Sequence, residues 1–307
     1  MEIEKTFSAL TEDSDIPLII ATDIEQFVIS PITFWCKIHA PEVHKDPPPS
    51  LYQQRLFDQG HAYQAEVIGA SYTGAVEKRF YDENEGFRLT LELMVAGERN
   101  IKNMPVMCRP LGLQGRPDVL TRVDDAASEL GSYSYSVVEI KTARNIQKAH
   151  ILQGAVYNRL VGVVQGYEPP KFYITNRDGA TQAIQMADVN DELDQVLSDM
   201  RAVMEGRKVI DPCYGGGRWP WETYVNNLAV QANDVSLIPG VGVAIREGLI
   251  REGYRTVEAV ANARGEELTK VPRVGKTTAR KFITVAQAIH EARPVRRDHD
   301  LQLPSGH

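Results

Sequence analysis

A carboxylate and an ammonium group stand two residues apart in the apolar segment VVEIKTA, at Glu139 and Lys141. The surrounding residues are β-branched and aromatic and predict a buried strand. Side chains two residues apart on a strand point to the same face. Burying two charges costs several kcal/mol per ion unless each has a partner. The two residues therefore form either a structural ion pair or part of a site for a charged ligand.

A second carboxylate is expected beside the first. The segment LQGRPDVLTRV (113–123) predicts the preceding strand, and the polar stretch DDAASELGS predicts a hairpin loop between the two strands. Neighbouring antiparallel strands lie about 5 Å apart, so Asp118 can lie next to Glu139. A hard divalent cation such as Mg²⁺ relieves the repulsion between two carboxylates, and Lys141 could stabilise charge on a phosphoryl group. This combination predicts metal-assisted hydrolysis of a phosphodiester.

The arrangement resembles the active site of the PD-(D/E)XK nuclease superfamily. The residues that carry the resemblance are Pro117-Asp118, Glu139-Ile140-Lys141 and, on the following helix, Gln153 and Tyr157 in QGAVYN. The last two look like the QxxxY element of RecB-type members, and they share one helix face with His150. The resemblance extends over about residues 20 to 225.

This resemblance implies a Mg²⁺- or Mn²⁺-dependent DNA nuclease with a restriction-endonuclease-like core. It implies that the metal is held by Asp118, Glu139, the carbonyl of Ile140 and Gln64. Lys141 would orient or stabilise the attacking hydroxide. The remaining two residues, Gln153 and Tyr157, would support Lys141 or contact the DNA strand.

Gln64 departs from the RecB-type pattern, which usually has a histidine or glutamate four residues after a glycine, here Gly60. The amide oxygen of glutamine is a weaker ligand, and the sequence leaves open whether Gln64, His61 or Glu66 completes the metal site. Two alternatives to a DNA nuclease stay open. One is a weakened or inactive nuclease fold that acts as a DNA-binding or scaffold module, and the other is an enzyme specific for RNA or branched DNA.

The three cysteines do not predict an iron–sulfur cluster. Some RecB-like nucleases hold such a cluster with four cysteines, and Cys36 and Cys213 lie at comparable places in this sequence. Two thiolates are too few for a cluster. Cys108 is expected to pack as a small apolar residue.

A repeat with a period near 33 residues occupies the C-terminal part of the chain. Its two copies contain Pro239-Gly240-Val241-Gly242 and Pro272-Arg273-Val274-Gly275-Lys276, each followed by a helix. The repeat resembles the tandem helix-hairpin-helix module, which implies sequence-independent binding of DNA phosphates. The expected DNA-binding residues are Gly240, Gly242, Arg273, Gly275, Lys276 and Thr277. A protein–protein adaptor is the alternative role for this module.

Charge separates this region from the rest of the chain. Residues 235–297 hold twelve Lys and Arg against six Asp and Glu, a net charge of +6, so with −7 overall the remainder carries −13. We expect a nuclease domain over 1–230, a helix-hairpin-helix domain over 231–297 and a disordered tail over 298–307. The acidic N-terminus and the lack of a long apolar run predict a cytoplasmic protein without a membrane span. A protein partner such as a helicase stays open.

The elements that must position these residues follow from periodicity and turn residues. Helices are expected over 51–71, 87–97, 145–166 and 189–207, and strands over 105–110, 113–123, 134–143, 171–176 and 181–186. Gly115 and Pro117 suggest a bulge or a sheet edge within one of these strands. The predicted fold class is α/β, with a mixed sheet flanked by helices, plus a small all-α domain.

Overall fold

The structure is a computed structural model that describes residues 1–291, apart from the side chains of Gln53, Leu56, Phe57 and His61. The chain forms two compact units. The first unit contains Met1–His39 and Pro47–Ile210, and the second contains Ala40–Asp46 and the chain from Asp211 onward. The boundary predicted at residue 230 falls inside the second unit. The tail expected over 298–307 lies outside the described residues.

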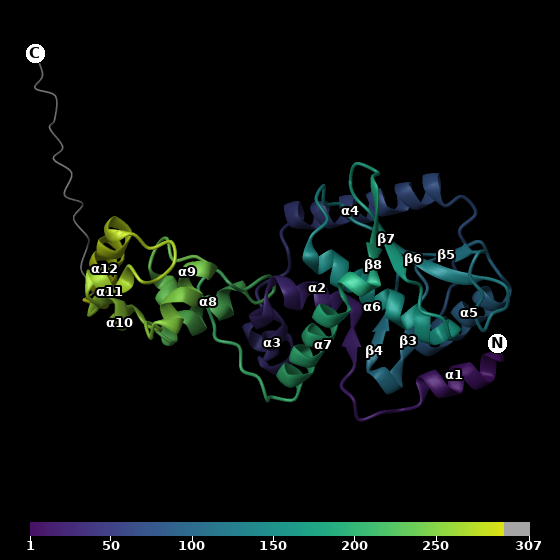
Figure 1. The fold of residues 1–307 in the computed structure, drawn as a ribbon, viewed down its shortest axis with the longest axis horizontal. Helices are drawn as coiled ribbons and strands as arrows, with labels where there is room; N and C mark the ends of the chain where they lie inside the picture. The colour runs from purple at the N-terminus through teal and green to yellow at the C-terminus, as the bar shows by residue number, and fades with distance from the viewer. Residues whose placement is uncertain (292–307) are drawn as a thin grey trace, which may run out of the picture. The chain divides into compact units, whose positions relative to one another are not determined.

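A five-stranded mixed sheet carries the segment VVEIKTA in the first unit (Figure 1). Its strands, in spatial order, are β2 (Asn100–Lys102), β5 (Val119–Val123), β6 (Ser134–Ile140), β7 (Lys171–Thr175) and β8 (Thr181–Gln185). Strands β6 and β7 are parallel, and the other neighbours are antiparallel. The two predicted hairpins, β5–β6 and β7–β8, are confirmed.

A second, three-stranded sheet has the order β1 (Ile19–Ile20), β4 (Leu113–Gly115) and β3 (Val106–Cys108). The single strand predicted over 113–123 is therefore wrong, because β4 and β5 belong to different sheets. The chain crosses between the sheets at residues 116–118. A Cβ on Gly115 would lie 2.4 Å from a ring carbon of Tyr157, so this position needs glycine to let the ring approach. Asp118 stands at the end of the crossing, directly before β5.

Seven α-helices surround the sheets in the first unit. They are α1 (Ile3–Thr11), α2 (Ala21–Ile29), α3 (Pro31–His39), α4 (Leu51–Ser71), α5 (Glu83–Val95), α6 (Lys148–Gln165) and α7 (Asn190–Met204). The four helices predicted from the sequence correspond to α4, α5, α6 and α7. Helix α6 ends where Gly166 takes a left-handed conformation, with φ of 64°, as expected for a helix C-terminus.

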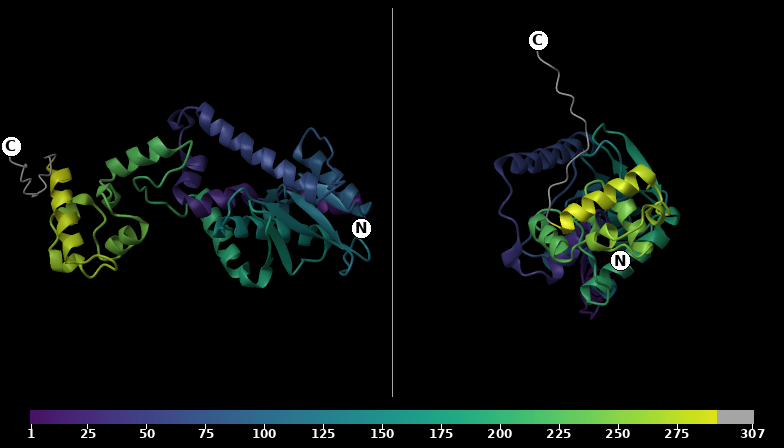
Figure 2. Two further views of the ribbon diagram at one scale, coloured as in Figure 1. Left: turned by 90° about the horizontal axis from the view of Figure 1, so that it is seen from above. Right: turned by 90° about the vertical axis from the view of Figure 1, so that its left-hand side faces the viewer.

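Helix α6 is buried along nearly its whole length, because it contacts strands of both sheets as well as α2 and α7. Helix α4 covers the opposite face of the five-stranded sheet (Figure 1 and Figure 2). Strand β6 lies between the two helices and is buried on both faces. Val138 and Ile140 pack toward α4, whereas Tyr135 and Val137 belong to the cluster around α6. Since side chains alternate, Glu139 faces α6.

The second unit has its own apolar core, made by short helices and the turns between them. Its helices are α8 (Glu222–Gln231), α9 (Val243–Arg251), α10 (Val257–Ala261), α11 (Gly265–Leu268) and α12 (Lys276–His290). An all-α C-terminal region is thus confirmed. Within residues 1–291, no helix is long and apolar enough to cross a membrane.

Candidate active site and nucleic-acid interface

Asp118 and Glu139 are held together by two reciprocal hydrogen bonds to the backbone. The amide of Asp118 donates to Oε1 of Glu139 over 3.1 Å, and the amide of Ile140 donates to Oδ2 of Asp118 over 2.7 Å. Each carboxylate is therefore oriented by the strand that carries the other. Glu139 is only 2% exposed. The expected juxtaposition of the two carboxylates is present.

Burial raises the pKa values of both carboxyl groups and so disfavours their simultaneous ionisation. Loss of solvent, followed by repulsion from Asp118, raises the pKa of Glu139 to about 8. Burial also raises the pKa of Asp118, against the opposing effects of the Ile140 amide and the Lys141 ammonium. A divalent cation would favour ionisation of two adjacent carboxyl groups with raised pKa values and would stabilise the site.

Lys141 lies on the same side of the sheet and joins several partners. Its Nζ lies 3.5 Å from Oε2 of Glu139 and 3.3 Å from Oε2 of Glu25, and it donates to Oε1 of Gln153. Burial alone would lower the pKa of Lys141, but the carboxylates of Glu139, Glu25 and Asp118 outweigh it and raise the pKa. The ammonium therefore stays charged beside the carboxylate pair.

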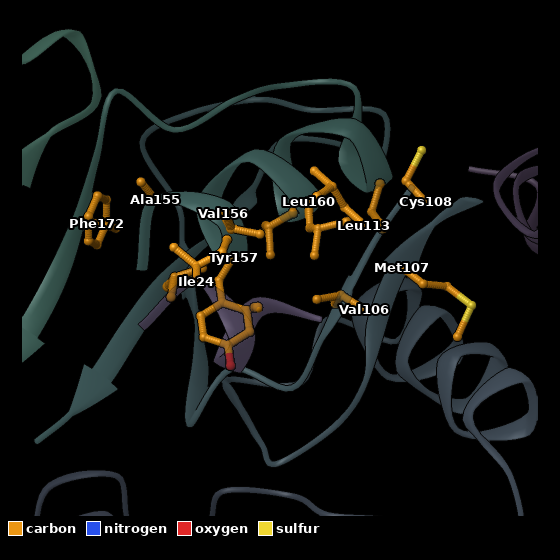
Figure 3. Packing of buried hydrophobic residues seen from close by; sticks show 14 of the residues in the cluster. Ile24, Val106, Met107, Cys108, Leu113, Ala155, Val156, Tyr157, Leu160 and Phe172 are labelled. Atoms are coloured by element: carbon orange, nitrogen blue, oxygen red, sulfur yellow. The ribbon is translucent and has the colours of Figure 1, made fainter. Parts of the chain in front are cut away.

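Gln153 and Tyr157 continue this chain of contacts along α6. The amide nitrogen of Gln153 donates to the hydroxyl of Tyr157 over 3.2 Å, while its amide oxygen accepts from Lys141. The Tyr157 ring belongs to the same buried apolar cluster as Ile24 (Figure 3). Burial, reinforced by Glu139, raises the pKa of Tyr157 well above its ordinary value. The phenol thus stays protonated and fixes the amide that faces Lys141.

Glu25 is a site residue that sequence reasoning missed. It extends from α2, and its second carboxylate oxygen lies 3.8 Å from Nε2 of His150. Nδ1 of His150 accepts from the amide of Gln147 over 3.2 Å, which leaves Nε2 to carry the proton that faces Glu25. Glu25 lies 116 residues before Lys141, so no short-range spacing connects the two.

Gln64 reaches the site with its amide nitrogen. This nitrogen donates to the carbonyl oxygen of Ile140 over 3.1 Å, so Gln64 contacts another expected metal ligand instead of presenting its own oxygen there. Glu66 is exposed, and the side chain of His61 lies outside the described residues. No three His, Cys, Asp or Glu side chains gather as a metal cage in the described part of the chain. The oxygen donors that fit a hard cation are the two carboxylates and the carbonyl of Ile140.

The second unit presents two equivalent hairpin turns. In the first, the amide of Val241 donates to Ile238 over 3.0 Å, and in the second Val274 donates to Val271 over 3.1 Å. Each turn ends in a glycine of nearly identical conformation directly before a helix, Gly242 before α9 and Gly275 before α12. The unpaired amides of a helix start favour a phosphate oxygen.

The two turns differ in charge. The left-handed position is Gly240 in the first turn, with φ of 96°, and Arg273 in the second, with φ of 70°. The first residue of the helix is Val243 in the first copy and Lys276 in the second. Arg273, Lys276 and Thr277 are all exposed. The second turn therefore offers cations where the first offers none.

Comparison with known proteins assigns this part of the chain. Residues 232–288 match the family described as SAM-like helix-hairpin-helix tandem. The chain carries a tandem helix-hairpin-helix domain. A domain of this family implies DNA binding, and its residues include both hairpin turns described above.

Two relatives share sequence with part of the chain. The ATP-dependent DNA helicase Hel308 of Aeropyrum pernix is 41% identical over 56 residues, which are 18% of this chain and 8% of the helicase. The DNA repair and recombination protein RadA of Methanoculleus marisnigri is 34% identical over 68 residues, 22% of this chain and 21% of RadA. The chain thus spans only a small part of either relative.

One solved structure is similar over a larger share of the chain. The crystal structure of SSO0001 covers 64% of this chain and 82% of its own, at 16% sequence identity and a TM-score of 0.29. A similarity at this level does not establish a shared fold.

Proposed function

We propose that the first unit is a Mg²⁺- or Mn²⁺-dependent DNA nuclease of the PD-(D/E)XK type, and that the helix-hairpin-helix domain holds its substrate. The observation that carries the proposal is the buried pair of Asp118 and Glu139, hydrogen-bonded to each other's strands, with the Lys141 ammonium 3.5 Å from Glu139. A DNA-related role agrees with the helicase and the recombination protein that part of this chain resembles.

Each residue of the site would have a separate role in phosphodiester hydrolysis. Asp118, Glu139 and the carbonyl of Ile140 would hold the cation. When bound, the cation would polarise the scissile phosphate and favour ionisation of the attacking water. The ammonium of Lys141 would stabilise negative charge on the phosphoryl oxygens. Gln153 would position Lys141 through its amide oxygen.

The test is digestion of single-stranded, duplex and forked DNA, and of a matching RNA, under titration with Mg²⁺ and Mn²⁺. Cleavage of DNA that requires metal and disappears with chelator would support the proposal. A protein that binds metal and DNA but cleaves none of these substrates would refute nuclease activity.

A DNA-binding or scaffold module with a nuclease-like site is the second candidate. The hydrogen bond from Gln64 to the Ile140 carbonyl favours it, because this bond competes for one of the oxygens that a cation would use. Under this function, Gln64→His would restore the usual ligand type and create metal-dependent cleavage where the natural protein has none.

The two hairpin turns should make unequal contributions to DNA binding. Lys276→Ala is expected to weaken DNA affinity and to lower the slope of log affinity against log salt by about 1, since one phosphate contact is lost. Val243→Lys places a cation at the equivalent position of the first turn and should raise the slope by a similar amount. Fluorescence anisotropy with duplex DNA across a salt series measures both. Equal slopes in all three proteins would favour an adaptor role.

Arg273 should lower the free energy of unfolding of its domain while strengthening DNA binding. A non-glycine residue at φ of 70° costs about 1–2 kcal/mol relative to its right-handed conformation, so Arg273→Gly should raise the free energy of unfolding by about 1 kcal/mol. The same change removes a cation and should weaken DNA binding. Gly240→Ala is the matched control in the other turn and should lower stability without changing charge. Chemical denaturation and anisotropy measure the two effects, and unchanged DNA affinity in Arg273→Gly would contradict a phosphate contact.

A further inference from the structure

A cleft of about 1060 Å³ lies in the first unit and has no part in the site described above. The residues that line it include Lys78, Arg79, Phe80, Tyr81, Glu83 and Arg116. Most of these residues form the segment that leads into α5. This segment begins as an added edge of the five-stranded sheet, because Val76 pairs in parallel with Ile101 of β2.

The cleft opens at the end of the sheet that carries the carboxylates. The cleft segment runs parallel to β2, and just beyond the end of β2 the amide of Asn103 donates to the carbonyl of Asp118 over 3.2 Å. The amide of Lys78 lies 3.3 Å from the sulfur of Met104, the next residue along. Arg116 lines the cleft from only two residues before Asp118. A residue that lines the cleft is therefore close in sequence to the candidate active site, and the cleft lies at the same end of the sheet.

Two cations in the cleft remain available for a ligand. Arg116 pairs with Glu83, and its guanidinium lies 4.8 Å from the centre of the Phe80 ring. In contrast, Lys78 and Arg79 are exposed, and neither side chain has an ion pair among residues 1–291. Adjacent unpaired cations at the sheet end near Asp118 suit the phosphate backbone of a strand that leads toward the site.

An aromatic ring stands beside these cations. Tyr81 is 99% exposed, the highest value of any large apolar or aromatic side chain described. Aromatic rings next to cationic side chains form stacking platforms for the bases of single strands. In a duplex the faces of the bases are covered by their neighbours, so a surface ring can stack on a base only where the strand is unpaired.

We infer that this cleft binds single-stranded DNA on its way to the candidate active site, with one base stacked on Tyr81 and phosphates contacted by Lys78 and Arg79. The inference deepens the proposed nuclease function, since it assigns the substrate strand and the side of the site from which it enters. DNA is favoured over RNA because the same chain carries the helix-hairpin-helix domain.

Binding measured without metal tests the cleft separately from catalysis. The full chain in chelator is titrated with a labelled single-stranded oligonucleotide and with a blunt duplex. Tyr81→Ala should weaken single-strand affinity by about tenfold, whereas Tyr81→Phe, which keeps the ring, should bind as the natural protein does. Lys78→Ala combined with Arg79→Ala should lower the salt slope on the single strand by about 1.4, or 0.7 for each contact. Lys5→Ala, an exposed lysine outside the cleft, is the charge control.

A local readout excludes effects of the other DNA-binding unit. An oligonucleotide that contains 5-iodouracil should photocrosslink to the peptide that contains Tyr81, and the crosslink should disappear in Tyr81→Ala. Equal losses of single-strand and duplex affinity, or no loss in Tyr81→Ala, would overturn the inference. If the variants show these binding effects but the protein cleaves no DNA, the inference about the cleft would be supported and the nuclease proposal would be refuted. The opposite result, DNA cleavage with no effect of the cleft variants on binding, would support the nuclease proposal and refute the role of the cleft.

Discussion

Replacing Glu139 with glutamine is expected to abolish cleavage and, at the same time, to make the metal-free protein more stable at pH 8. Cleavage is lost because the change removes one of the two carboxylates that would hold the cation. Stability increases because the buried carboxylate of the natural protein is costly when ionised, and glutamine of the same shape carries no charge. A gain in stability together with a loss of activity is expected where a residue serves activity at a cost in stability.

The pH dependence of stability gives this prediction its sign. The pKa of Glu139 rises from an ordinary value of 4.5 to about 8 on folding, so the folded state binds this proton more tightly than the unfolded state does. The free energy of unfolding should therefore fall as pH rises from about 4.5 to 8. Since each pKa unit corresponds to about 1.4 kcal/mol, and the raised pKa of Glu139 already includes the contact with Lys141, Glu139→Gln should gain on the order of a few kcal/mol at pH 8.

Denaturant unfolding at pH 5 and pH 8, with and without Mn²⁺, measures this effect. Mn²⁺ should stabilise the natural protein, more strongly at the higher pH, and should leave Glu139→Gln unchanged. If the carboxylate were only half of a structural ion pair, Glu139→Gln would instead destabilise the protein at pH 8, and Mn²⁺ would have no effect on either form.

Lys141→Ala is expected to abolish cleavage while leaving metal binding intact. The ammonium is not a ligand, and removing a positive charge near the cation should keep or increase metal affinity. In the metal-free state the same change removes the cation that Glu25 and Glu139 share, so the metal-free variant should be less stable than the natural protein. Saturating Mn²⁺ should restore part of this loss, about 2.7 kcal/mol at a concentration of 100 Kd.

Calorimetric metal titration, thermal melts and single-turnover cleavage test these three expectations together. Lys148→Ala is a matched control, because Lys148 is a lysine of the same unit whose pair with Glu192 is exposed to solvent; an exposed pair contributes at most about 1 kcal/mol. Full cleavage by Lys141→Ala, or loss of metal binding in that variant, would contradict the role assigned to the ammonium.

The sequence was sufficient to predict the elements whose signals are local. The β-branched run around Glu139 predicted β6, and the length and spacing of the segment ending at Gly166 predicted α6. The face shared by Glu139 and Lys141, and that shared by Gln153 and Tyr157, followed from the periods of strand and helix. The hairpin repeat was visible because the same short turn occurs twice.

Other features depended on contacts that no local pattern records. Asp118 lies at a crossing between two sheets. Gly115, just before the crossing, must admit the Tyr157 ring, and this approach exists only in the folded chain. Glu25 joins the site from a helix far away in sequence. The Gln64 amide turns its nitrogen to the carbonyl of Ile140, because a carbonyl oxygen accepts from a donor and repels a second oxygen.

The burial of α6 has a consequence for how the protein loses activity. Gln153 and Tyr157 lie on the helix that contacts both sheets, so the groups that position Lys141 cannot open to solvent unless the core of the unit opens with them. Their backbone amides should therefore exchange with deuterium only through global unfolding, and heat inactivation should coincide with melting of the unit. The exposed segment that carries Tyr81 should behave differently. Its backbone amides should exchange with deuterium through small local fluctuations while the catalytic groups remain in place.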